Sequence, residues 1–179
     1  MIGWKLVGWG MLVVLVDLKF ENVDLIVDVV GWLLAYAGLR KLWRLDRAFR
    51  PAAGFASLGA VASLPELVPS YDFGGWLREG LLTLIWGAVV ILTCTGLMRL
   101  ADRVRDERVE SRARWIRSAQ VIAVALALAI GWQSDGELDS GFGLLAVLAV
   151  VFGFGTAVAF ILAMLSRNSV TTFRGATIT

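Results

Sequence analysis

Long apolar stretches alternate with short polar turns along the whole chain. An α-helix crosses the hydrocarbon core of a bilayer with about 20 mostly apolar residues. Six apolar stretches of the chain approach this length, and they predict an all-α, polytopic membrane bundle. The bundle is one domain covering residues 1–179, with a short cytoplasmic tail over 166–179. The third helix is rich in Ala, Gly and Ser, and it could instead be short or partly re-entrant. The six predicted spans form three hairpins and lie near residues 2–20, 23–41, 52–69, 79–99, 116–133 and 142–165.

Charged residues follow the same alternation. Lys and Arg in short loops accumulate on the cytoplasmic side of a membrane. With the N-terminus inside, all but Lys19 and Arg78 of the 17 basic residues fall on the inner side, whereas most of the 15 acidic residues fall outside. We therefore expect both termini in the cytoplasm and a multi-pass protein of the cell membrane.

Composition excludes several kinds of chemistry. Hydrophobic residues make up 58% of the chain and charged residues only 18%, which is far from the profile of a soluble domain. With one Cys and no His, a thiol and imidazole pair or a His-ligated metal is not available. Cys94 lies within the fourth span and is expected to pack as a small apolar residue. We expect no enzymatic activity, no catalytic residues, no metal and no cofactor.

Acidic residues gather in the turn between the first two spans. Asp24 and Asp28 are four residues apart and share a face of the second helix if that helix begins near Asn22. Asp17, at the end of the first span, could approach Asp28 across the hairpin. Carboxylates near hydrocarbon are costly, and two held close together can share a proton or bind a cation. The sequence thus suggests a cation, proton or solute site at Asp17, Asp24 and Asp28. The alternative is that Asp24 caps the helix and Asp28 pairs with Lys19 or Arg78.

Basic residues between the second and third spans form a second candidate site. The pattern predicts a short interfacial helix with one apolar and one basic side, lying on anionic headgroups at the cytoplasmic face. The same residues could dock a protein partner, or they could only fix the topology. A nucleic-acid role is not expected, because acidic residues are interspersed with the Arg residues of the next loop. The docking residues are Arg40, Lys41, Arg44, Arg47 and Arg50.

The loop between the fourth and fifth spans predicts helix that continues beyond the membrane. Arg103 with Glu107 and Glu110 with Arg114 are oppositely charged pairs at i,i+4 spacing. Deep in the spans, Trp9, Trp32 and Trp86 are expected to pack in the bundle and not to bind a ligand.

Small residues recur at every fourth position of three spans, where they let helices approach closely. They predict a compact bundle with the third span near its centre, although the same faces could form a homo-oligomer. These positions are Ala52, Ala56 and Ala60; Ala119, Ala123, Ala127 and Gly131; and Ala149, Gly153 and Ala157.

The first 50 residues resemble the N-terminus of small bacterial multi-span proteins with an acidic outer turn. The likeness is carried by residues 17–20, 23–28, 30–34 and 38–42; Val27 stands where those proteins commonly have Pro. This resemblance implies no known activity. In size and topology the chain is also similar to the substrate-binding subunits of energy-coupling-factor vitamin transporters, without their motifs. Two functions remain open: a structural or regulatory membrane component that docks lipid or a partner, and a small transport-type module.

Overall fold

The chain folds into α-helices joined by short connections. The computed structural model describes residues 2–16, 25–64, 75–133 and 140–165, and these residues contain six α-helices and no strand. The all-α class predicted from the sequence is confirmed for this part of the chain. The helices are α1 (Ile2–Val16), α2 (Leu25–Trp43), α3 (Phe49–Ala62), α4 (Gly75–Val104), α5 (Glu107–Gln133) and α6 (Ser140–Leu165).

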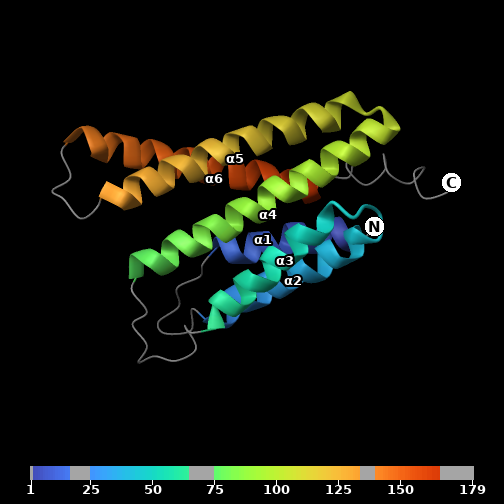
Figure 1. Ribbon diagram of the computed structural model, residues 1–179, viewed down its shortest axis with the longest axis horizontal. Coiled ribbons are helices and arrows are strands. Elements are labelled where there is room, and N and C mark those ends of the chain that lie inside the picture. Colours follow the sequence, from blue (N-terminus) through green and yellow to red (C-terminus); the bar gives the residue numbers. More distant parts are fainter. Residues whose placement is uncertain (1, 17–24, 65–74, 134–139, 166–179) are drawn as a thin grey trace.

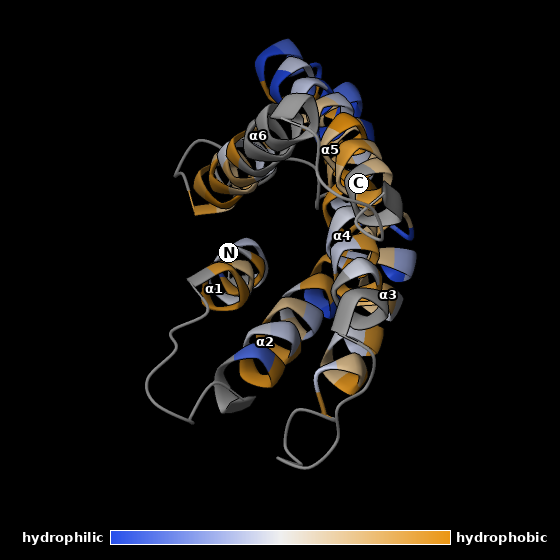
Figure 2. Ribbon diagram, turned by 90° about the vertical axis from the view of Figure 1, so that its left-hand side faces the viewer, coloured by the Kyte–Doolittle hydropathy of each residue, from blue (hydrophilic) through white to orange (hydrophobic). Residues whose placement is uncertain are grey.

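The six helices form a ring in chain order. Each helix packs against the next one along the chain, and α1 packs against α6, which closes the ring (Figure 2). Consecutive helices run in opposite directions, so the α2–α3 and α4–α5 connections lie at the same end of the bundle as the beginning of α1 and the end of α6 (Figure 1). At this closing contact Gly8 of α1 lies close to α6, where an added Cβ would be 2.9 Å from side-chain atoms of Leu165.

The α1–α2 pair is the most closely packed part of the ring. Its contact surface has glycine at seven-residue intervals, at Gly3 and Gly10 on α1 and at Gly31 and Gly38 on α2. A Cβ placed on Gly10 would lie 2.5 Å from the backbone oxygen of Gly31 and from the backbone nitrogen of Ala35. Backbone atoms cannot move aside as a flexible side chain can, so glycine is required at this contact.

The small-residue faces of α3, α5 and α6 are used largely as predicted. Ala52, Ala56 and Ala60 are buried, and Gly153 of α6 faces Ala123 of α5. However, α3 occupies a place in the ring between α2 and α4 and not the centre. Only one face of α3 is small, whereas Phe55, Leu58 and Val61 on its other face are exposed. Its 14 residues are also fewer than the predicted 52–69 span.

Hydrophobic side chains cover the outside of the ring as well as its interior. Gly80–Val104 of α4 is the one helical segment in the described residues that is long and apolar enough to cross a membrane, judged by length and composition. Shorter apolar helical segments cover Gly3–Leu15 and Val151–Leu165. Large apolar side chains are exposed on every helix of the ring, including Trp9, Leu33, Leu58, Leu84, Ile122 and Leu162.

Candidate functional site

A pocket of about 420 Å³ lies inside the ring. Five helices supply its walls, and α3 alone contributes no lining residue. The walls are mostly apolar, with polar groups at Asp28, Thr83 and Gln120. The lining residues of α1 lie near the end of that helix, and those of α2 and α4 lie near the beginnings of theirs. The pocket is therefore in the half of the bundle away from the α2–α3 and α4–α5 turns. The apolar lining includes Val14, Leu15, Leu82, Val124, Ala127 and Phe154.

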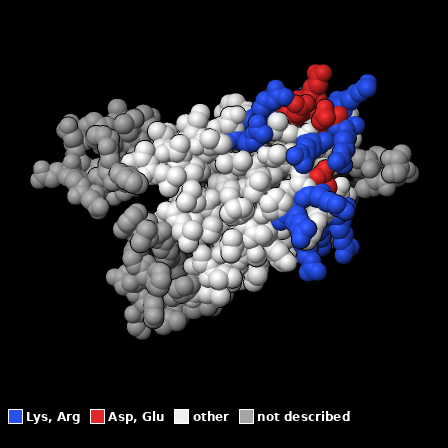
Figure 3. Space-filling model, viewed as in Figure 1, with Lys and Arg blue, Asp and Glu red and all other residues white. Residues whose placement is uncertain are grey.

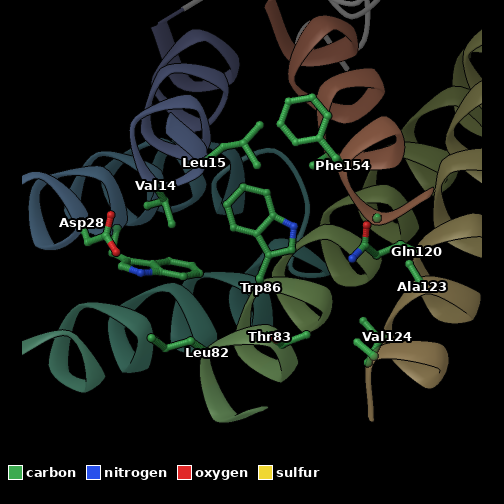
Figure 4. Close-up of a pocket in the computed structure, with 14 residues that line it drawn as sticks. Val14, Leu15, Asp28, Leu82, Thr83, Trp86, Gln120, Ala123, Val124 and Phe154 are labelled. Carbon is green, nitrogen blue, oxygen red and sulfur yellow. The ribbon is translucent and has the colours of Figure 1, made fainter. Parts of the chain in front are cut away.

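Asp28 is the acidic residue of this pocket. It lies in the first turn of α2, and its side chain borders the pocket beside Val14 of α1 (Figure 4). Trp32 follows one helical turn later, so the carboxylate and the indole lie on the same face of α2. The packing of α1 against Gly31 fixes this face of α2 toward the interior of the ring.

Two tryptophans contact one another in the wall, which also contains the aromatic ring of Phe154. Trp32 of α2 and Trp86 of α4 meet edge to face, with ring centroids 6.2 Å apart and an interplanar angle of 77°. Trp32 is only 1% exposed. Its indole lies directly on Gly59 of α3, where an added Cβ would come within 2.5 Å of the ring. This glycine therefore sets how far the indole of Trp32 sits from the centre of the pocket.

Gln120 provides the polar group on the opposite wall. It is buried on α5, and its side-chain oxygen lies 3.0 Å from the Thr156 hydroxyl of α6, which is also 2.8 Å from the backbone oxygen of Gly153. The amide nitrogen is consequently the part of Gln120 on the Trp86 side of the pocket (Figure 4). A ligand here would meet a carboxylate on α2, the Trp86 indole on α4 and the Gln120 side chain on α5, while the buried Trp32 indole packs against Trp86.

The acidic site suggested by the sequence is thus placed only in part. Asp17 and Asp24 lie outside the described residues, so their approach to Asp28 stays a prediction. The structure brings Asp28 together with Trp32, Trp86 and Gln120, none of which was assigned to a site from the sequence. Trp32 is buried as expected, but the prediction for Trp9 is wrong: its side chain is 53% exposed on the outside of the ring.

The predicted docking residues lie at the end of the bundle that holds the α2–α3 and α4–α5 turns. Lys and Arg gather at this end in Figure 3, and we call it the basic end. The predicted interfacial helix is wrong. Instead, α2 continues to Trp43, a tight turn follows, and α3 begins at Phe49. Leu39, Leu42 and Phe49 are buried in the core, which prevents this segment from lying on the bilayer as a separate helix. Across the turn, the guanidinium of Arg50 on α3 lies 5.0 Å from the centre of the Trp43 ring at the end of α2. The predicted docking residues, all of them exposed, are Arg40, Lys41, Arg44, Arg47 and Arg50.

Asp46 holds this turn together. Its Oδ1 accepts a 2.7 Å hydrogen bond from the backbone N–H of Ala48, and its Oδ2 lies 2.7 Å from a guanidinium nitrogen of Arg103 on α4. The Asp46 side chain is only 5% exposed, whereas that of Arg103 is 59% exposed. The pair therefore joins the two basic turns at their inner side.

The α4–α5 turn is the second basic turn. Of the two ion pairs predicted there, one is wrong and the other is confirmed. Arg105 adopts a positive φ of 54° and ends α4, so Arg103 and Glu107 lie on different helices and the i,i+4 pairing is wrong. Asp106 then caps α5, because its Oδ1 accepts a 3.1 Å hydrogen bond from the N–H of Val109. Glu110 and Arg114 form the predicted ion pair on α5.

Comparison with known proteins gives no relative. No family model, curated protein or solved structure matches the chain. Among the described residues no group of three or more His, Cys, Asp or Glu side chains is placed to hold a metal ion.

Proposed function

We propose that the protein is a multi-pass cell-membrane protein whose interior pocket binds a monovalent organic cation. Membrane placement is supported by the 25-residue apolar segment of α4 and by the apolar side chains exposed around the ring. In water such a surface would aggregate, whereas lipid tails cover it at no cost. In this proposal the bundle lies across the bilayer, although α1 with 15 residues and α3 with 14 are shorter than a full span. The basic end with both termini faces the cytoplasm.

The proposed topology is tested with single cysteines. The chain has one Cys, the buried Cys94, so a Cys94→Ser background carries no other thiol. In intact cells a membrane-impermeant maleimide should label Asn22→Cys but not Arg47→Cys, and permeabilisation should make Arg47→Cys reactive. Labelling of both positions, or of neither, before permeabilisation would contradict the arrangement.

The observation that carries the binding proposal is the Asp28 carboxylate beside Trp32 and Trp86 in a mostly apolar pocket. An ionised carboxylate in a medium of low dielectric constant is costly, and a cation bound beside it offsets that cost. Indole faces attract organic cations and pack well against apolar groups. A pocket of about 420 Å³ also falls among the sizes of known small-ligand sites.

Hard metal cations suit this pocket poorly. Ca²⁺ takes about 6 to 8 oxygen ligands, whereas the polar lining here comes from Asp28, Thr83 and Gln120. An organic cation needs one counter-charge and a large apolar contact area. We therefore propose a transport-type binding module for an amphiphilic cation, which holds its solute without chemical conversion.

The test uses two ions of the same shape and opposite charge, tetraphenylphosphonium and tetraphenylborate. Wild-type protein in detergent should bind the cation and not the anion. Asp28→Asn keeps the size of the side chain and removes its charge, so the affinity for tetraphenylphosphonium should fall at least about tenfold. The matched control is Asp102→Asn, an exposed acid at the basic end. Equal binding of both ions by wild type, or unchanged cation binding by Asp28→Asn, would overturn the proposal.

A second role is supported by the basic end itself. Its exposed Arg and Lys side chains surround the α2–α3 turn, and each basic residue near an anionic membrane surface contributes about 1 kcal/mol of attraction. We propose that this end docks anionic headgroups. Vesicles with and without phosphatidylglycerol measure this attraction directly, and equal association with both kinds of vesicle would contradict it.

A further inference from the structure

The outer side of the α5–α6 contact carries a groove made of two adjoining pockets. One, of about 570 Å³, lies nearer the basic end and is bordered by Ser111, Arg112 and Leu162. The other, of about 450 Å³, lies deeper and is bordered by Ile122, Leu126 and Phe152. Trp115 borders both pockets, so they follow one another along the same helix pair.

Chemical character changes along this groove in one direction. Arg112 and Ser111 at one end are exposed polar groups, the indole of Trp115 follows and is 60% exposed, and the rest of the wall is apolar except for Thr156. A phospholipid has the same order, with an anionic phosphate, a polar backbone at the interface and an apolar chain. Trp is the side chain that prefers the level between headgroup and hydrocarbon.

The length of the groove fits one leaflet. From Trp115 to Leu126 the helix rises about 16 Å, compared with about 15 Å for half of the hydrocarbon core. Because α5 begins at Glu107, the Arg112 end of the groove lies beside the α4–α5 turn, at the basic end of the bundle. Anionic lipids are concentrated in the cytoplasmic leaflet, which this end faces in the proposed topology.

We propose that this groove is a site for one anionic phospholipid, with its phosphate on Arg112 and Ser111, its glycerol region at Trp115 and an acyl chain between α5 and α6. The inference rests on the membrane placement proposed above and goes beyond the general attraction of the basic end. Diffuse attraction would depend on every exposed basic residue alike. A built site depends on Arg112 far more than on a basic residue elsewhere at the same end.

The experiment is native mass spectrometry of the full chain in mild detergent with added phosphatidylglycerol or phosphatidylcholine. Arg112→Gln should reduce retained phosphatidylglycerol at least about tenfold, the loss expected when a hydrogen bond to a charged group is removed. The matched control, Arg44→Gln, removes an exposed charge from the α2–α3 turn and should change retention less than twofold. Phosphatidylcholine retention should be low in all three proteins.

A second arm reports the position of the acyl chain. Phosphatidylglycerol with a brominated chain should quench wild-type fluorescence, and Trp115→Phe should remove a distinct part of that quenching. Equal losses in Arg112→Gln and Arg44→Gln, equal retention of the two lipids, or unchanged quenching in Trp115→Phe would overturn the site. A failure of the membrane placement is distinguishable, since wild-type protein would then be recovered outside the membrane fraction.

Discussion

The two ends of the bundle use an acidic side chain in opposite ways. At the basic end, Asp46 is enclosed by the protein: one oxygen accepts the Ala48 N–H and the other pairs with Arg103. In the other half, Asp28 borders a pocket of about 420 Å³ with two indoles. The Asp46 carboxylate stabilises a turn, whereas the Asp28 carboxylate borders an interior pocket, where we propose that it contacts a bound cation. The contrast predicts that Asp46 matters for stability and Asp28 for binding.

We expect the largest effect on stability at the contact between α1 and α2, two of the helices that line the pocket. In Gly10→Ala the added methyl group would lie 2.5 Å from backbone atoms of α2, so α1 and α2 must separate. Overpacking of this kind costs about 1 to 3 kcal/mol of unfolding free energy. Because Gly10 abuts Gly31, three residues from Asp28, cation binding should fall as well.

Gly54→Ala is the control for this prediction. It makes the same chemical change on α3, where an added methyl group meets nothing within 4 Å. Thermal unfolding in detergent, followed by circular dichroism, should separate the two variants. Equal unfolding midpoints would show that the close approach of α1 and α2 contributes little to the fold.

A smaller effect is expected at the basic end. Asp46→Ala removes both the hydrogen bond from the Ala48 N–H and the pairing with Arg103. We expect the free energy of unfolding to fall by about 2 kcal/mol. Asp46→Asn retains an acceptor for the Ala48 N–H, so its cost should be nearer 1 kcal/mol, because Arg103 is largely solvated. Tetraphenylphosphonium affinity should stay at the wild-type value in both variants, provided that it is measured below their unfolding midpoints. Reduced affinity would mean that the two ends are coupled.

The smallest effect tests the aromatic wall. Trp86→Phe keeps an aromatic ring but reduces its area and its attraction for a cation, so tetraphenylphosphonium affinity should fall about threefold. The control is Trp9→Phe, the same change on the outer surface of α1. If the two substitutions change the affinity equally, Trp86 does not contact the ligand.

Local sequence patterns predict much of the fold, but they do not predict which residues meet in the pocket. Apolar runs and turns predict the helices, and i,i+4 spacing predicts the Glu110–Arg114 pair. The meeting of Trp32 with Trp86 depends on how α2 and α4 face one another across the ring, which no local spacing encodes. The role of Asp46 was missed for the same reason, since its partner Arg103 lies 57 positions away. The seven-residue spacing of Gly3, Gly10, Gly31 and Gly38 was a usable signal for the α1–α2 contact.

The most direct test compares Asp28→Asn with Asp46→Asn in the same two assays, tetraphenylphosphonium affinity and thermal unfolding. We expect Asp28→Asn to lose at least about tenfold in affinity and to lower the unfolding midpoint less than Asp46→Asn does. Asp46→Asn should retain the affinity and lower the midpoint. Two results would contradict a direct contact between Asp28 and the cation. One is wild-type affinity in Asp28→Asn, and the other is a loss of affinity that follows the loss of stability in both variants.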